Sequence, residues 1–215
     1  MQRVAEWSLT VLSWWLVKVP GESRDEGEMQ IPTPTVFISY IHEDEEHREQ
    51  VLEFAQLLAG MGIDSVNDFW IEPYRHKLGE WAEHYIRNSD YTLVIASPRF
   101  RLIGDGYGTD DENRGGQWEI ALLREKLQQA RSEWTRRILP VLLPGHTMEE
   151  IPDFLQPSGA HHYRVPEITR EGVDKLYRTL TGQQKHVKPE LGKPVVLRPK
   201  SGPGSPGWES WEQRY

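Results

Sequence analysis

Residues 35–41, Thr-Val-Phe-Ile-Ser-Tyr-Ile, form a short apolar run that the acidic run His42-Glu43-Asp44-Glu45-Glu46 follows at once. So short a run of β-branched and aromatic residues is typical of a buried strand in a parallel sheet, and acidic residues favour a helix start. This junction therefore predicts the first β-to-α turn of an open α/β fold. Ligands of such folds bind outside the carboxyl ends of the strands, where Ser39, Tyr40 and His42 are expected to lie.

Strands and helices are expected to alternate through the rest of the central region. The predicted order is helix 43–61, strand 63–66, helix 80–88, strand 91–96, a long polar segment 99–116, helix 117–134, strand 138–143, a weaker strand 161–165 and helix 169–180. This alternation requires right-handed crossovers and predicts a parallel sheet covered by helices on both faces. The strands at 36–40, 91–96 and 138–143 are expected to be central.

The two ends of the chain differ from this central region. We expect an N-terminal extension and linker at residues 1–32, one domain at residues 33–182, and an irregular tail rich in Pro and Gly at residues 183–215. The apolar stretch within residues 4–19 is too short to span a bilayer, which takes about 20 residues, and it lacks the marks of a signal peptide. Three interpretations stay open for it: a segment at a membrane surface, a helix that docks on a partner, or an extension upstream of a working start at Met29.

Composition argues against several classes of function. The formal net charge is −8 and Lys and Arg are not clustered, so nucleic acid is not an expected partner. The absence of Cys excludes disulfides, thiolate metal sites and cysteine nucleophiles, and it fits a reducing cytosol, so a cytoplasmic location is expected. No metal site is predicted, because the acidic turn at residues 110–112 lacks calcium-loop spacing and His161 and His162 alternate across a strand.

Six phrases of the sequence occur in an order that a known family shares. They are Val36-Phe37-Ile38-Ser39-Tyr40, Gly62-Ile63-Asp64 with Asp68 and Trp70 beyond it, Leu93-Val94-Ile95-Ala96-Ser97, Gly115-Gly116-Gln117-Trp118-Glu119, Ile138-Leu139-Pro140-Val141-Leu142 and Ile151-Pro152-Asp153-Phe154-Leu155. Over roughly residues 33–182 the chain resembles SEFIR domains of bacterial type, close relatives of TIR domains. The resemblance implies a flavodoxin-like sheet of five parallel strands with helices on both faces and a mobile loop after the second strand. It also implies one of two activities: like-with-like assembly of receptors and adaptors, or cleavage of NAD at the nicotinamide glycosidic bond.

The chemistry of NAD cleavage narrows the choice of catalytic residue. Nicotinamide leaves as a neutral base from a cationic ring, so one carboxylate near the ribose can suffice where ordinary glycosidases need two. Glu119 is the candidate, because we expect it in the first turn of its helix, where the helix dipole would keep it ionised. The family's use of a glutamate after a Trp in this helix supports that role, and the alternative is that Glu119 only favours the helix start. Glu125 is the rival acid, but it lies ~9 Å further along the helix axis.

The other candidate residues are expected to contact the NAD substrate around Glu119, and no separate cofactor is expected. They are Ser39, Tyr40, Asp68, Trp70 and Trp118. Trp70 and Trp81 flank the loop after the second strand and could stack on a ring of the substrate. Packing on the sheet is the more usual role of aromatic residues at such an edge.

Two classes of function stay open for this sequence. The favoured hypothesis is a cytosolic effector domain that hydrolyses NAD upon self-assembly, in bacterial immune signalling against phage, and that depends on Ser39, Asp68 and Glu119. The alternative is a non-enzymatic module for homotypic protein–protein contacts, which would depend on the loop at residues 73–76. The enzyme is preferred because the sequence contains no receptor or transmembrane segment.

Overall fold

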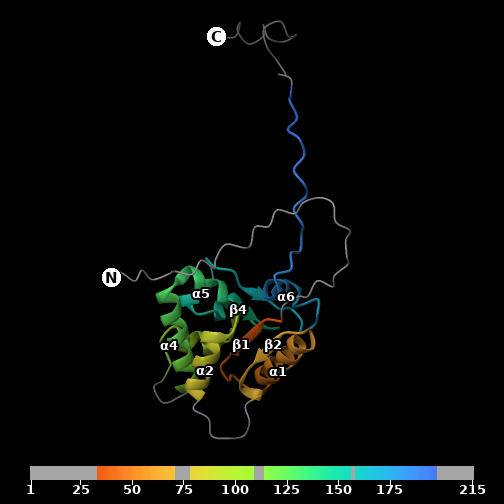
Figure 1. Cartoon of the computed structure of the whole chain (residues 1–215). Coiled ribbons are helices and arrows are strands. Elements are labelled where there is room, and N and C mark those ends of the chain that lie inside the picture. Colours follow the sequence, from red (N-terminus) through yellow and green to blue (C-terminus); the bar gives the residue numbers. More distant parts are fainter. Residues whose placement is uncertain (1–32, 71–77, 109–113, 156–157, 198–215) are drawn as a thin grey trace, which may run out of the picture.

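The structure, a computed structural model, describes residues 33–70, 78–108, 114–155 and 158–197. Within these residues five strands form one parallel sheet in the spatial order β2-β1-β3-β4-β5 (Figure 1). Their bounds are Thr35–Ser39 for β1, Asp64–Val66 for β2, Tyr91–Ile95 for β3, Ile138–Leu142 for β4 and Tyr163–Arg164 for β5. The predicted fold class is confirmed, and β1, β3 and β4 are the three central strands.

Helices cover both faces of this sheet. Their bounds are Glu45–Gly60 for α1, Leu78–Asn88 for α2, Pro98–Gly104 for α3, Arg114–Gln129 for α4, Arg131–Arg137 for α5 and Asp174–Thr181 for α6, and three short 3-10 turns are η1 (Asp68–Trp70), η2 (Met148–Glu150) and η3 (Asp153–Leu155). In Figure 1 α2, α4 and α5 gather on one side of the strands, while α1 and α6 lie on the other. The sequence periodicity of strands and helices thus produces three layers.

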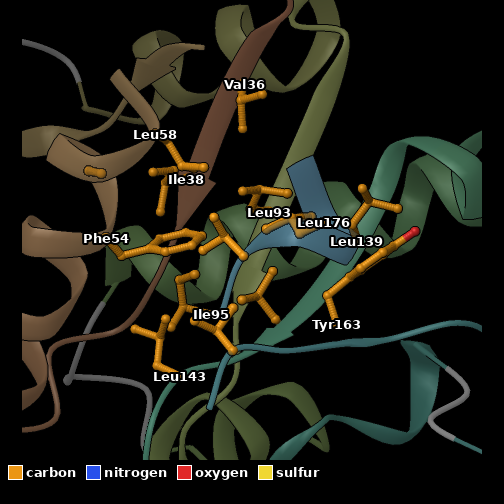
Figure 2. Packing of buried hydrophobic residues seen from close by; sticks show 14 of the residues in the cluster. Val36, Ile38, Phe54, Leu58, Leu93, Ile95, Leu139, Leu143, Tyr163 and Leu176 are labelled. Carbon is orange, nitrogen blue, oxygen red and sulfur yellow. The ribbon is translucent and has the colours of Figure 1, made fainter. Parts of the chain in front are cut away.

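Alternating side chains along the strands divide the core into two clusters. Val36 and Ile38 of β1 pack with Phe54 and Leu58 of α1 and with Leu176 of α6, as Figure 2 shows. On the opposite face, a second cluster joins residues of β1 and β3 to α2, α3, α4 and α5; it includes Phe37, Val94, Ile86, Phe100, Leu123 and Trp134. Burial on both faces explains why these strands are apolar throughout rather than alternating in polarity.

The structure corrects the prediction that residues 99–116 form a polar segment without a helix. The helix α3 begins directly after β3, where the extended Ser97 places its Oγ 3.1 Å from the backbone nitrogen of Phe100 and accepts its hydrogen bond. Pro98 follows in the first turn, where its missing N–H leaves no partner unsatisfied. The pair Ser97-Pro98 is therefore a capped helix start.

The helix predicted at residues 117–134 is also different in the structure. The helix α4 begins earlier, at Arg114, and ends at Gln129, and α5 starts again at Arg131. Between them Ala130 leaves the helical region, with φ −149° and ψ 74°. The break lets Trp134 bury its ring under the guanidinium of Arg137, 4.2 Å from the ring centroid.

The predicted closing helix at residues 169–180 is shorter, because α6 spans only Asp174–Thr181 and turns precede it. Residues 183–197 contain neither helix nor strand, and all but Gln183 are exposed. The apolar stretch at residues 4–19, the loop at 73–76 and the last residues of the tail lie outside the described residues. Among the helices that are described, none is long and apolar enough to cross a membrane.

Candidate functional site

A pocket opens at the carboxyl end of β1, between that strand, η1, α2 and the start of α4. Its volume is about 230 Å³, and it is lined by Phe37, Ile38, Tyr40, Ile41, His42, Asp68, Trp81, Gly115, Gly116 and Glu119. The crevice outside the strand ends is where an open α/β sheet binds ligands. The pocket therefore lies where the junction at residues 35–46 predicts a site.

Glu119 is fixed in this pocket by a hydrogen bond to the end of β1. The Ser39 Oγ donates to Oε2 of Glu119 over 2.8 Å, although the two residues are 80 positions apart in the chain. Ser39 is buried, with 1% of its surface exposed, so its rotamer is confined. Because α4 begins at Arg114, Glu119 lies in the second turn and not in the first turn as predicted.

The ionisation of Glu119 differs from the prediction. Burial raises the pKa of the Glu119 carboxyl from its ordinary value of 4.5 to about 7, the Ser39 hydrogen bond lowers it, and the nearby charge of Asp68 raises it. The expectation that the helix dipole keeps Glu119 ionised is wrong, because desolvation of the carboxyl outweighs the Ser39 hydrogen bond and Glu119 lies beyond the first turn, where the dipole acts most strongly. Near neutral pH the carboxyl is divided between its neutral and charged forms.

Three polar side chains form the mouth of the pocket. The Tyr40 hydroxyl lies 3.0 Å from Nε2 of His42, and the same nitrogen is 3.5 Å from Oδ2 of Asp68. The rings of Tyr40 and His42 stack with their centroids 5.1 Å apart. Burial and the negative charge of Asp68 raise the pKa of Tyr40, so its phenol stays protonated and can donate. The mouth thus offers a hydroxyl, an imidazole and a carboxylate to a ligand.

The opposite wall is formed by glycines and aromatic carbon. A Cβ on Gly116 would lie 3.1 Å from Cγ1 of Ile41, so this glycine lets α4 approach the end of β1 closely. Gly116 and Glu119 are three residues apart and share one helix face. Gly116 was not among the predicted site residues, and its i, i+3 spacing from Glu119 is the sequence signal that could have identified it. Trp81, on α2, meets the Phe37 ring edge-on at 5.6 Å, so it packs on the sheet and also lines the pocket.

The structure brings together Ser39, Tyr40, Asp68 and Glu119 of the predicted site residues, but not the two remaining tryptophans. Trp70 is 48% exposed and Trp118 is 38% exposed, and neither lines the pocket. The ring of Trp118 lies beside Gly79, 3.7 Å from the position of a Cβ there. The rival acid Glu125 is exposed and accepts a hydrogen bond from Gln129 at 2.5 Å, outside the pocket.

The part of the chain that the structure describes contains no cluster of side chains suited to bind a metal ion. No group of three or more His, Asp or Glu side chains there is placed to hold a metal ion. The acidic turn at residues 110–112 lies outside the described residues, since these stop at 108 and resume at 114. The pocket itself offers the partly buried carboxyl of Glu119 together with the polar groups of Tyr40, His42 and Asp68.

Comparison with known proteins gives two findings. Residues 34–176 match the SEFIR domain family. A crystal structure of a prokaryotic SEFIR domain shares the fold with a TM-score of 0.51 and 24% sequence identity, over 77% of this chain and 100% of that chain. At this identity the likeness to the solved structure shows a common fold and nothing more. No curated protein matches the chain.

Proposed function

The chain belongs to the SEFIR domain family, a branch of the TIR-like superfamily, and we propose that it hydrolyses NAD at the nicotinamide glycosidic bond. Some members of this superfamily are NAD hydrolases, and the six sequence phrases led to the same hypothesis. One observation carries the proposal: the carboxyl of Glu119 is held by the buried Ser39 in the lining of a pocket outside the sheet's carboxyl edge.

The proposed reaction needs charge stabilisation at the ribose. The bond between C1′ and the pyridinium nitrogen breaks with its electron pair going to nitrogen, so nicotinamide leaves neutral and C1′ becomes oxocarbenium-like. A carboxylate of Glu119 beside C1′ stabilises this positive charge. Water then adds to C1′ and loses a proton to solvent, which gives ADP-ribose and one proton.

The raised pKa of Glu119 is compatible with this role. A group with a pKa of about 7 is partly ionised at neutral pH before substrate arrives. In the complex, the cationic nicotinamide ring favours the charged form of Glu119 and therefore lowers its raised pKa. Substrate binding thus drives Glu119 toward the carboxylate that the transition state needs.

The remaining pocket groups suit the nicotinamide riboside end of the substrate. Drug-sized ligands occupy pockets of roughly 300–1,000 Å³, so a volume of about 230 Å³ holds this end alone and leaves the adenosine half outside. Asp68 and the Tyr40 hydroxyl are placed at the mouth, where they can bind ribose hydroxyls. Gly115 and Gly116 leave the start of α4 without side chains, so the diphosphate can approach backbone amides there.

Self-assembly, a cytoplasmic location and a role in bacterial immune signalling against phage complete the proposal. They rest on the family alone, since SEFIR domains are interaction modules. The alternative is a non-enzymatic module that acts by homotypic contacts. The observation that favours this alternative is the exposure of Trp70 and Trp118 on the surface outside the pocket.

The test is to incubate the purified full chain, concentrated or with a crowding agent, with NAD while nicotinamide and ADP-ribose are separated and quantified. Glu119→Gln keeps the size of the side chain and removes its charge, so turnover should fall by about 10² or more, as for loss of one strong electrostatic group. Glu125→Gln, on the same helix but exposed, is the matched control and should keep wild-type turnover.

Near-UV circular dichroism must show that the Glu119→Gln variant is folded. Full turnover in this variant would move the catalytic role to another residue. Absence of nicotinamide release by assembled wild-type protein would leave the non-enzymatic alternative as the function.

A further inference from the structure

A chain of two histidines and a glutamate lies at the carboxyl edge of the sheet, apart from the pocket lining. Nδ1 of His47 is 3.2 Å from Nε2 of His146, and Nδ1 of His146 bonds the carboxylate of Glu150. His47 is in the first turn of α1, with 3% of its surface exposed. His146 and Glu150 belong to the segment after β4, and their side chains are 14% and 18% exposed.

The hydrogens of this chain can be assigned from what each group is able to donate. A carboxylate only accepts, so Nδ1 of His146 carries the proton and its Nε2 is left as an acceptor. Nδ1 of His47 must then donate to that nitrogen. This leaves Nε2 of His47 as a bare acceptor, buried and with no hydrogen-bond partner among the described residues. With both imidazoles neutral, every group of the chain is satisfied except this one buried nitrogen. When both imidazoles are protonated, two N–H groups face each other and neither ring can accept.

The chain of hydrogen bonds joins parts of the protein that are far apart in sequence. His47 and His146 are 99 residues apart, and their contact ties the start of α1 to the segment that contains η2. The same segment is held by Arg101 of α3, whose Nη1 donates to the carbonyl of Glu149 in η2 at 3.2 Å and to that of Ile151 just after it at 2.7 Å. The ring of Tyr40, which lines the pocket, lies 6.4 Å from the His47 ring.

Protonation of His47 is costly, and protonation of both rings removes the hydrogen bond between them. A proton on His47 places a charge in a buried position, and burial is the largest cause that lowers its pKa from 6.5, followed by the facing His146. His42, near the end of β1, acts in the same direction, while Glu43 and Asp44 before α1 favour the charged form. A pKa below the unfolded value means that the native contact is stable above about 6.5 and loses stability as the pH falls below it.

We propose that His47, His146 and Glu150 form a pH-sensitive latch, which holds α1 to the segment after β4 at neutral pH and opens in mild acid. Two imidazolium rings at this separation repel and cannot share a hydrogen bond, so the doubly protonated chain separates. Because the Tyr40 ring lies against His47, opening of the latch loosens one wall of the pocket. The latch is independent of whether the pocket hydrolyses NAD.

The test is amide hydrogen exchange of the full chain at about pH 7.5 and about pH 5.5, on either side of an ordinary histidine pKa. After correction for the intrinsic rate, exchange in residues 44–50 and 143–151 should rise about tenfold or more in acid, while β3 stays protected. Gln replaces a neutral imidazole but cannot take up a proton. His47→Gln and His146→Gln should therefore each lose most of this pH dependence.

His84→Gln is the matched control, since His84 is exposed on α2 and should leave the wild-type response unchanged. Should His47→Gln fail to fold at neutral pH, His146→Gln decides, because its ring is at the more accessible end of the chain. Unchanged protection of wild-type protein in acid would overturn the latch. The same acid response in the two latch variants as in wild type would overturn it as well.

Discussion

At the scale of single residues, burial and the contact with Ser39 act in opposite directions on the charge of the proposed catalytic group, Glu119. If the carboxylate is the active form, NAD turnover should rise with pH as Glu119 loses its proton, with a midpoint near its pKa of about 7. The measurement is kcat/KM against pH, because that quantity reports ionisation in the free enzyme. The residual activity of Glu119→Gln should show no such midpoint.

Ser39→Ala should shift the pH midpoint of NAD turnover in a defined direction. The hydrogen bond from Ser39 lowers the pKa of Glu119, so its removal raises that pKa and moves the activity midpoint to higher pH. A purely structural role of Ser39 would reduce turnover at all pH values and leave the midpoint in place. Ser39→Thr retains a hydroxyl and should restore the wild-type midpoint.

Glu119 also sets a pH dependence of stability. Its folded pKa of about 7 lies above the ordinary 4.5, so the native state binds more protons and loses stability as the pH rises between these values. At pH 8 the free energy of unfolding of Glu119→Gln, measured by urea denaturation, should therefore exceed that of wild type by about 2 kcal/mol, after allowance for solvent in the pocket. At pH 4 the two proteins should differ little. Glu125→Gln, which is exposed, should show no gain at either pH.

At the scale of helices and strands, sequence periodicity predicts the strands well and the helix starts poorly. Runs such as residues 91–96 are short and mostly apolar, which is typical of a strand that is buried on both faces. The sequence predicts a long polar segment that ends at Gly116 and a helix that starts at residue 117. In the structure Gly115 and Gly116 are both inside α4, although glycine weakens helices by roughly 1 kcal/mol, and Gly116 lets the helix approach Ile41 closely. Because the predicted helix starts three residues too late, the prediction places Glu119 in the first turn, whereas the structure has it in the second.

The helix α3 offers a test of close packing between elements. A Cβ on Gly104, at its end, would lie 2.5 Å from Cγ of the rigid Pro152 ring, so Gly104→Ala must displace the segment between η2 and η3. We expect a loss of about 1–3 kcal/mol in the free energy of unfolding, as for overpacking. Gly115→Ala is the control, because no atom lies within 4 Å of its Cβ position, and it should be neutral or slightly stabilising. Equal stability of the two variants in urea would contradict this account of α3.

At the scale of the whole molecule, the order of the parallel strands explains how much of the site the sequence could predict. Ser39 and Tyr40 follow from one strand end, and a parallel sheet gathers all such ends at one edge. Asp68 and Glu119 were predicted from the family's phrases, and the topology brings both to that edge. The latch pair His47 and His146 could not be predicted, because nothing local in the sequence links a residue in α1 to a segment 99 positions later.

Self-assembly is a property of the whole molecule, and Trp118 provides a way to test it. Trp118 is exposed beside the pocket, and an exposed aromatic side chain is a frequent anchor of a protein interface. If assembly switches on the enzyme, turnover per chain should rise with protein concentration over about a hundredfold range, by mass action. Trp118→Ser should shift this rise to higher concentration by about tenfold, with the same plateau, and sedimentation velocity should show the matching shift in association. Glu125→Gln, on an exposed face of the same helix, should shift neither curve.

Two outcomes would contradict this account of Trp118 and of assembly. A loss of turnover in Trp118→Ser that is equal at every protein concentration would show that Trp118 contacts NAD. Turnover per chain that is independent of protein concentration in wild type would contradict activation by assembly.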